Sequence, residues 1–580
     1  MKRFFGFVLF AGLSLAPMAA AINREAFTIT KYDLAVHLEP DQQRLGARGK
    51  ITIRNDSDQP QKLVALQISS SLNWRSIRVD GKVVQFVSQS YVSDIDHTGA
   101  LSEAIVTLPA EIKPKDSVEI EIGYEGVVQL DATRLTRVGV PEGTAKHASW
   151  DQIAPSFTGV RGAGYVAWYP ITTEAADFSE GNGLFEVVDR WKARTAGSEF
   201  KAIVSADLED GEALPTVICS SNSGSFVDGE GALRRTSGRC LWEKLGTAIP
   251  TFVMAQYAGE SKPPLMLFSF LGHEAGVATY SNAIEPAMKF VTGWFGQPSA
   301  PVAIADLQDP NSAPFESGTL LMASMGAEDS KLAGINLVHE LVHSAVSSPR
   351  PWVYEGLAHF AEAMYRQEQG GRQTALDFLG IHRAAFLDSE KEVSAAIAKN
   401  AGQKNAIKTG AGQPLFSTFD ETYYRSKAAY VWWMLRDMIG DAPLKEAIRK
   451  YRPEDDKDPK YVQQLIEAAA KRDLGWFFED WVYHDRGLPD LHVQSVHPWT
   501  TDQGVRFITV TLENLGSAGA EVPFTVIFEG GEITKRIEVR AKSTATTRVQ
   551  VPQPATEIKI NDGSVPEIDL ANNVFEVPAS

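Results

Sequence analysis

The pattern of hydrophobic and polar positions changes twice along the chain. From about residue 27 to residue 257, short segments alternate apolar and polar residues between turn formers, as residues 32–38 do. Alternation with a period of two predicts antiparallel strands. Between residues 278 and 471, apolar residues recur three and four positions apart, which predicts helices. After Pro489 the alternation returns, as in residues 506–512, and predicts a second set of strands.

This order of patterns predicts a multidomain α+β protein. Residues 22–262 should form an N-terminal antiparallel β domain, and residues 263–488 should form a mostly helical domain. The last block, residues 489–580, is long enough for a small C-terminal β-sandwich. The sequence shows no long repeat and no low-complexity tract that would indicate a solenoid or a disordered linker.

The first 21 residues have the features of a secretory signal peptide. Lys2 and Arg3 precede an apolar run over residues 4–15, and small residues follow it up to Ala20 and Ala21. This run is too short to span a bilayer comfortably. We therefore expect an exported protein, periplasmic or extracellular, that is cleaved near Ala20 or Ala21; an uncleaved N-terminal anchor is the alternative. A second apolar stretch of about 18 residues is missing from the sequence, so no membrane span is expected in the mature chain.

The composition is that of an ordinary globular protein with large cores. Hydrophobic residues make up 44% and charged residues 22% of the 580 residues, which excludes wholesale disorder, a coiled coil and collagen. The 56 Lys and Arg residues against 73 Asp and Glu residues give a net charge of −17, spread along the chain. An acidic surface repels phosphate backbones, so we expect no nucleic acid partner.

The chain has two cysteines, Cys219 and Cys240. In an exported protein, a small even number of cysteines suggests a structural disulfide. Turn-forming residues lie between the two cysteines and strand-like segments flank them, so the expected picture is a hairpin held by the disulfide. Two free buried thiols are the alternative. A zinc–thiolate site is disfavoured, because two further ligands with metal-like spacing are absent nearby in the sequence.

Candidate chemistry is concentrated in one predicted helix. It contains His339-Glu340-Leu341-Val342-His343, in which the two histidines lie four positions apart. That spacing places both imidazoles on one helix face, where they can converge on one cation. Glu340 lies beside them, close enough to take a proton from a metal-bound water. The alternative is a buried core helix with two hydrogen-bonded histidines.

The next predicted helix carries W-x-x-E-G-x-A at residues 352–358. Together with H-E-x-x-H at residues 339–343, this segment resembles the gluzincin aminopeptidases, the family of aminopeptidase N. The resemblance implies a thermolysin-like catalytic domain in the mostly helical region and one Zn²⁺ per chain. It also implies that Glu355, the Glu before the Gly, is the third zinc ligand beside His339 and His343.

Spacing along the chain offers a competing choice for the third ligand. In the family, eighteen residues commonly separate the second His from the ligand Glu, and the same count from His343 reaches Glu362. We favour Glu355, because the Trp-x-x-Glu-Gly context is more specific than a loop length and the loop after the second His is short here. Glu362 then matches an acidic position that often follows two turns later in the family. His359 is expected beside the ligands or in the core.

Two further segments match the family in part. Residues 313–322 resemble the G-x-M-E-N segment, an edge strand whose Glu binds the free α-amino group of the peptide, which implies that role for Glu316. An exposed Glu in a loop is the alternative. Residues 423–429 resemble the Y-x-K-G segment, whose Tyr stabilises the tetrahedral oxyanion. This implies Tyr424, with Tyr423 as the second choice, although the spacing from Tyr424 to the Lys is one residue longer here.

These residues together predict a zinc peptidase that acts on peptide substrates. Glu340 would take a proton from the metal-activated water and pass it to the leaving amine, while Tyr424 and the zinc would hold the oxyanion. An aminopeptidase is the first choice. Because the family's long helical C-terminal domain is not matched here, a zinc endopeptidase of the same fold is the second. A non-catalytic binding protein with a relic zinc site is the third choice. The sequence predicts neither the oligomeric state nor the side-chain preference at the cleavage site.

Overall fold

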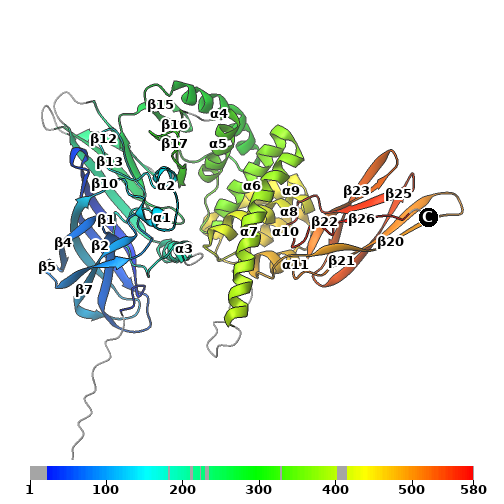
Figure 1. The fold of residues 1–580 in the computed structure, drawn as a ribbon, viewed down its shortest axis with the longest axis horizontal. Helices are drawn as coiled ribbons and strands as arrows, with labels where there is room; N and C mark the ends of the chain where they lie inside the picture. The colour runs from blue at the N-terminus through cyan, green and yellow to red at the C-terminus, as the bar shows by residue number, and fades with distance from the viewer. Residues whose placement is uncertain are drawn as a thin grey trace, which may run out of the picture.

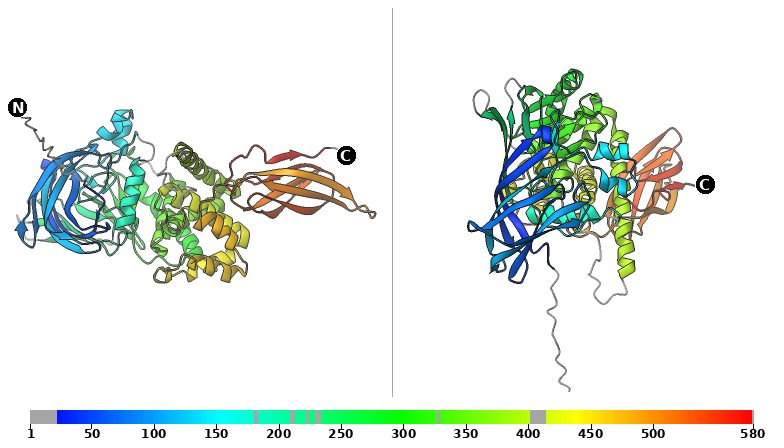
Figure 2. Two further views of the ribbon diagram at one scale, coloured as in Figure 1. Left: turned by 90° about the horizontal axis from the view of Figure 1, so that it is seen from below. Right: turned by 60° about the vertical axis from the view of Figure 1, so that its left-hand side comes forward.

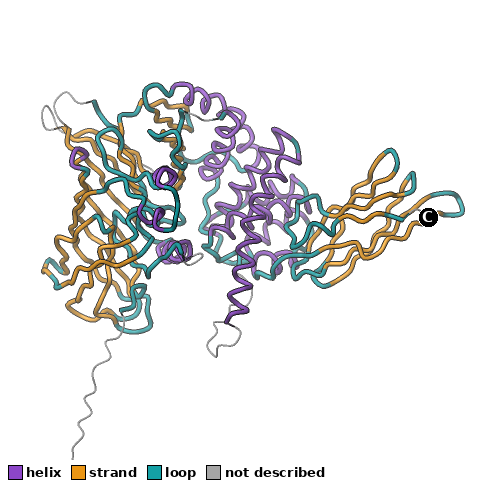
Figure 3. Tube along the Cα trace, viewed as in Figure 1, coloured by secondary structure: helices purple, strands orange, loops and turns teal. Residues whose placement is uncertain are grey.

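The computed structural model describes residues 22–179, 183–208, 213–221, 224–228, 234–326, 329–400 and 414–578. The molecule is elongated, with a β-rich N-terminal part and the C-terminal sheets at opposite ends and most of the helices between them (Figure 1, Figure 3). The view from below shows the same succession (Figure 2). The predicted multidomain α+β architecture is confirmed, while the three predicted domain ranges stay predictions. The predicted signal peptide, residues 1–21, lies outside the described residues.

The N-terminal part is built on an eight-stranded sheet with the order β12-β13-β10-β1-β2-β8-β4-β5. The prediction of an antiparallel domain is corrected at one pair, because β1 and β10 run parallel. Parallel neighbours need a long crossover connection, and residues 40–198 separate these two strands. The strands are β1 (Phe27–Glu39), β2 (Arg44–Asn55), β4 (Leu72–Val79), β5 (Lys82–Val83), β8 (Ser117–Val127), β10 (Glu199–Leu208), β12 (Gly224–Asp228) and β13 (Arg234–Trp242).

Two three-stranded sheets, β3-β7-β6 and β11-β14-β9, share the hydrophobic core of the large sheet. Three helices that the alternating pattern did not predict lie between β8 and β10 in the chain. The strands are β3 (Gln61–Ser69), β6 (Phe86–Val92), β7 (Ala100–Ile112), β9 (Thr158–Val160), β11 (Thr216–Cys219) and β14 (Phe252–Ala255), and the helices are α1 (Thr133–Arg137), α2 (Glu142–Ala148) and α3 (Gly183–Thr195).

The predicted disulfide between Cys219 and Cys240 is confirmed, but the predicted hairpin between the two cysteines is wrong. Cys219 ends β11, which pairs with β14, whereas Cys240 lies in β13, which pairs with β10 and β12. The disulfide therefore joins two different sheets across a Cα–Cα distance of 5.5 Å. The turn-rich segment between the cysteines contains β12, and it is β12 that forms the hairpin with β13.

The middle of the chain combines a five-stranded sheet, β15-β16-β17-β19-β18, with the predicted helices. The hairpin of β15 and β16 spans residue 262, the last residue of the predicted N-terminal domain. The strands are β15 (Ala258–Lys262), β16 (Leu265–Ser269), β17 (Val302–Asp306), β18 (Phe315–Ser317) and β19 (Leu320–Ala323), and the helices are α4 (Glu274–Trp294), α5 (Ser330–Ala345), α6 (Pro351–Gly370), α7 (Arg372–Asn400), α8 (Ala428–Ile439), α9 (Asp441–Lys450), α10 (Tyr461–Ala470) and α11 (Gly475–Phe478).

Helices α5 and α6 pack against each other and carry the residues of both motifs. The carboxylate of Asp329 caps α5 by accepting a hydrogen bond from the backbone N–H of Lys331 at 2.7 Å. Helix α6 begins with Pro351, whose fixed φ suits the first turn. A Cβ on Gly356 would lie 2.6 Å from the Cβ of Ala428. The Gly of the W-x-x-E-G-x-A motif therefore lets α6 approach α8 closely.

Two antiparallel sheets, β20-β21-β24 and β23-β22-β25-β26, form the C-terminal part. Their buried residues, such as Val510 and Val526, belong to one hydrophobic cluster with the helices. The indole N–H of Trp481, shortly after α11, donates to the carbonyl of Gly519, directly before β22, at 2.8 Å. The strands are β20 (Leu491–Thr500), β21 (Arg506–Asn514), β22 (Ala520–Phe528), β23 (Gly531–Val539), β24 (Ser543–Val551), β25 (Ala555–Ile560) and β26 (Val574–Glu576).

None of the helices that the structure describes combines the length and the apolar character that crossing a bilayer requires.

Candidate functional site

Four elements bring the predicted site residues together, and Glu316, His343, Glu355 and Tyr424 line one cavity of about 290 Å³. Helix α5 carries the H-E-x-x-H motif and α6 carries both candidate third ligands. Strand β18 and a turn before α8 supply the remaining predicted residues. The walls of the cavity include Lys192, Glu316, His343, Glu355, Tyr424 and Arg425.

The imidazoles of His339 and His343 meet at their Nε2 atoms. These two nitrogens lie 2.9 Å apart. Glu355 Oε2 lies 4.0 Å from the Nε2 of His339 and 3.8 Å from the Nε2 of His343. All three residues are buried. The four-residue spacing on α5 and the adjacent first turns of α6 thus aim two nitrogens and one oxygen at the same point.

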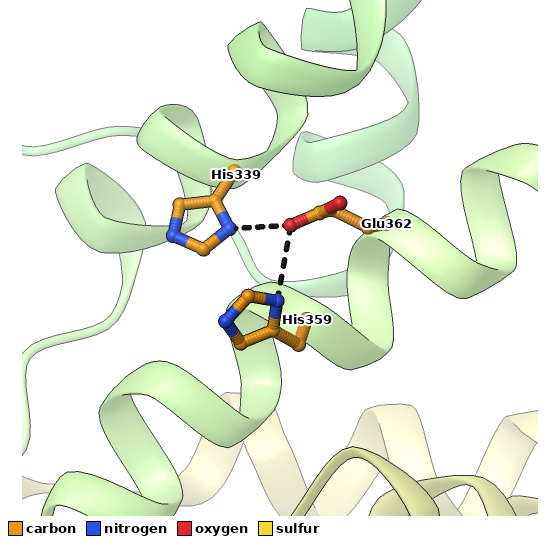
Figure 4. A group of neighbouring side chains, drawn as sticks. All are labelled: His339, His359 and Glu362. Atoms are coloured by element: carbon orange, nitrogen blue, oxygen red, sulfur yellow. Dashed lines mark hydrogen bonds and ion pairs between the residues drawn. The ribbon is translucent and has the colours of Figure 1, made fainter. Parts of the chain in front are cut away.

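Glu362 lies on the other side of the His339 ring. Its Oε1 is 2.8 Å from Nδ1 of His339 and 3.1 Å from Nδ1 of His359, so that one carboxylate contacts two rings (Figure 4). A carboxylate on Nδ1 orients a histidine and leaves its Nε2 free for a metal. His339, His359 and Glu362 also bring three possible metal-ligand atoms together. That second group uses the opposite nitrogen of His339.

Glu340 is buried, and neither of its carboxylate oxygens has a hydrogen-bond partner in the described part of the chain. Burial and the nearby negative charge of Glu316 raise the pKa of Glu340 well above its usual value. A bound dication acts in the opposite direction, because its charge favours the ionised carboxylate. A cation close to Glu340 would therefore stabilise its ionised carboxylate in this buried position.

Glu316 lies on β18, the edge strand of the five-stranded sheet. Its Oε2 is 3.3 Å from Nε2 of His339, and its Oε1 accepts a hydrogen bond from Nη2 of Arg425 at 3.1 Å. The Nε of Arg425 also lies 3.5 Å from Oε2 of Glu355. Arg425 therefore bridges two carboxylates of the cavity.

Tyr424 lines the cavity, whereas the ring of Tyr423 packs against Phe386 with a centroid distance of 5.7 Å. Both tyrosines belong to a π-helical turn, Thr422–Lys427, which leads into α8. A π turn accommodates one more residue than an α turn, and such turns occur often at functional sites.

The charges around the two histidines favour a cation. Burial alone would lower the pKa of His339, but the carboxylates of Glu316 and Glu362 raise it to about 10. Burial, followed by the positive charge of His339, lowers the pKa of His343 well below its usual value. The carboxylates around the pair therefore stabilise positive charge at this point.

The residues at this point fit a zinc ion. Two imidazole nitrogens and one carboxylate are a donor set that zinc takes in catalytic sites. Glu355 Oε2 and His343 Nδ1 have no hydrogen-bond partner among the described residues, although both atoms are buried. Burying a polar atom without a hydrogen bond costs free energy, and a ligated cation would give the Glu355 oxygen a closer contact than the Arg425 guanidinium at 3.5 Å does.

Sequence reasoning missed three charged residues of the cavity wall, Arg425, Lys192 and Glu421. Arg425 directly follows the predicted Tyr424, so its position in the chain was a usable signal. Lys192 comes from α3, a helix that was not predicted, and its ammonium contacts Glu421. A pairing between residues so far apart in sequence has no local pattern that could reveal it.

Comparison with known proteins gives similarity of structure only. No family model matches the chain, and no curated protein sequence matches it. A solved structure of the M1 zinc metallopeptidase from Deinococcus radiodurans is 14% identical to the chain, with a TM-score of 0.49. The match covers 80% of this chain and 96% of that one. A point mutant of the same enzyme gives a TM-score of 0.46 at 14% identity.

Proposed function

We propose that this protein is a zinc-dependent aminopeptidase that hydrolyses N-terminal residues from peptides. The observation that carries the proposal is the convergence of His339 Nε2, His343 Nε2 and Glu355 Oε2 beside the buried, unpaired carboxylate of Glu340. An H-E-x-x-H helix in this arrangement supplies both metal ligands and a general base. If the two histidines were purely structural, the burial of the Glu340 carboxylate without a hydrogen bond would have no explanation.

His339, His343 and Glu355 would hold the zinc, and Glu362 would orient His339 through its Nδ1. Zinc with three protein ligands and an open position lowers the pKa of a bound water toward about 7 and polarises a carbonyl. Export is part of the proposal, and the disulfide between Cys219 and Cys240 supports it, because disulfides persist in oxidising compartments.

The chain's own residues would move the proton and stabilise charge. Glu340 would accept the proton of the attacking water and deliver it to the leaving amine. The hydroxyl of Tyr424, at the wall of the cavity, would donate a hydrogen bond to the oxygen on which negative charge develops. Loss of one donor of this kind typically costs about 10²–10³ in turnover.

Glu316 is the proposed binding partner of the substrate's N-terminal ammonium. Because Arg425 already occupies Oε1 of this carboxylate, the ammonium would share Glu316 with the guanidinium. This sharing is also the observation that favours a second candidate function. If Arg425 neutralises Glu316 in the complex, a free amine gains little, and the site suits an endopeptidase.

Replacing Glu316 by alanine is expected to lower activity on unblocked peptides about 30-fold or more, because an uncompensated charge pair is commonly worth about 2–5 kcal/mol. The lower end is expected, since Arg425 shares the carboxylate. N-acetylated peptides lack the ammonium, so their slow cleavage should hardly change. The measurement is the ratio of kcat/KM between free and acetylated forms of one peptide, because this ratio cancels general damage to folding or metal binding.

A matched control is Glu260→Ala, at the opposite edge of the same sheet, where Glu260 pairs with Lys262 at 2.8 Å. This variant should keep the wild-type ratio. If wild type cuts acetylated or internal bonds as well as free termini, and Glu316→Ala leaves the ratio unmoved, then the endopeptidase becomes the better account.

A further inference from the structure

Helix α3 lies on the side of the N-terminal β-rich part that faces the helices (Figure 1). It is fixed there from one side. The indole of Trp191 is buried at a centroid distance of 6.1 Å from the ring of Tyr169. The guanidinium of Arg194 donates to the carbonyl oxygens of Phe27 and Thr172. These contacts hold α3 to the β strands and leave its other face for the catalytic helices.

That other face presents Lys192 to the cavity. Its side chain is only 4% exposed, and its Nζ donates to Oε1 of Glu421 at 2.5 Å. The same Nζ lies 3.5 Å from the hydroxyl oxygen of Tyr424, which is 232 residues away in the chain. Glu421 also accepts a hydrogen bond from Tyr424. An ammonium from the N-terminal part thus completes a triangle with the predicted oxyanion donor, in which Lys192 and Tyr424 are buried and Glu421 is one-third exposed.

The ammonium of Lys192 keeps its charge in this place. Burial would lower the pKa of Lys192, but the negative charge of Glu421 raises it above its usual value. Burial and the neighbouring charge of Glu421 raise the pKa of Asp189 to about 8, although Lys192 lies 3.9 Å away. At neutral pH the charged partners are therefore Lys192 and Glu421.

We propose that Lys192 is a positioning residue for Tyr424, so that the N-terminal part of the chain contributes directly to the catalytic centre. This inference rests on the proposed function, in which Tyr424 donates to the developing oxyanion. The ammonium donates to the phenol oxygen and neutralises Glu421. Both effects weaken the hydrogen bond from the phenol to the Glu421 carboxylate, so that the phenol proton can turn to the developing oxyanion when substrate is bound.

A structural role is the competing explanation, because a partly buried ion pair between two parts of a chain also fixes how they dock. Removal of one partner of such a pair strands the other charge and destabilises the fold. Turnover could then fall through misplacement of the whole cavity. The two roles differ in whether the loss depends on the hydroxyl of Tyr424.

The test is a double-mutant cycle that introduces Lys192→Met into wild type and into Tyr424→Phe. In wild type, kcat should fall about 10–100-fold, as is typical for loss of a residue that orients a catalytic group, while KM changes less than about threefold. In the Tyr424→Phe background, Lys192→Met should lower kcat no further. Arg190→Met is the matched control, because Arg190 lies on the same helix, is half exposed and pairs with Glu25.

A second variant covers the case in which Lys192→Met folds poorly. Lys192→Met/Glu421→Leu removes both charges, which is often neutral for stability, and its melting temperature should return toward wild type. The inference predicts that kcat stays at least tenfold low in this variant, because the donor to Tyr424 is still missing. Recovery of kcat together with the melting temperature would overturn it.

The outcomes also separate this inference from the function on which it rests. Equal losses of kcat in the wild-type and Tyr424→Phe backgrounds would overturn the inference and leave the proposed function standing. Full turnover in Tyr424→Phe alone would remove Tyr424 from the proposed function, and the role of Lys192 with it.

Discussion

Replacing Glu340 by glutamine is expected to leave zinc bound and to abolish peptide hydrolysis. Glutamine keeps the shape of the side chain but cannot accept a proton, and the three proposed ligands are untouched. Because neither carboxylate oxygen of Glu340 has a hydrogen-bond partner in the described structure, the amide loses no existing contact. General acid–base groups contribute about 10²–10⁴ in rate, so kcat should fall by a factor in this range or by more.

The measurement pairs kcat on an unblocked peptide with zinc content of the same preparation. Glu368→Gln is a suitable control, because Glu368 lies on α6 beyond the cavity and is exposed. Turnover near the wild-type value in Glu340→Gln, with zinc present, would remove Glu340 from the role of general base.

Replacing Glu355 by alanine is expected to empty the metal site, whereas the same change at Glu362 should only weaken it. Glu355 supplies the oxygen that faces both Nε2 atoms, so its loss removes a charge and one of three ligands. Glu362 contacts His339 at Nδ1, behind the ring. Loss of a residue that orients a metal ligand typically costs about 10–100-fold in affinity, so Glu362→Ala should retain more zinc than Glu355→Ala.

Elemental analysis of both variants, prepared in parallel, decides between the two carboxylates. Zinc retained in Glu355→Ala and lost in Glu362→Ala would contradict the proposal. The count of eighteen residues from His343 would then have identified the third ligand, and the group formed by His339, His359 and Glu362 would hold the metal.

Local sequence patterns predicted many of the helices and strands, but they predicted less well which of these elements lie side by side. The three- and four-residue recurrence of apolar positions between residues 278 and 471 predicted helices in the region where α4, α5, α6, α7, α8 and α10 lie. The same recurrence in Leu184, Val187, Val188 and Trp191 would have identified α3 within the β-rich part. The parallel pairing of β1 with β10 was beyond reach, because alternation indicates which face of a strand is buried and not which strand lies beside it.

In the candidate site, too, the sequence predicted what local geometry decides and missed what depends on contacts between distant parts of the chain. Helical geometry is sufficient to bring His339 and His343 together, because four residues make about one turn. The choice between Glu355 and Glu362 needed the position of α6 against α5, which decides which ring nitrogen each carboxylate meets. Arg425 directly follows Tyr424 and could have been inferred from that position, whereas Lys192 could not be predicted as a cavity residue, because a contact across 232 residues brings it there.

The central claim is that one zinc ion, held by His339, His343 and Glu355, makes this chain a peptidase. The most direct measurement is a titration of the metal-stripped full chain with Zn²⁺, with hydrolysis of an unblocked peptide as the readout. The account predicts that activity is negligible at first, rises in proportion to added zinc and reaches a plateau at one equivalent per chain. Zinc binding at one equivalent without hydrolysis of any unblocked or acetylated peptide would contradict it.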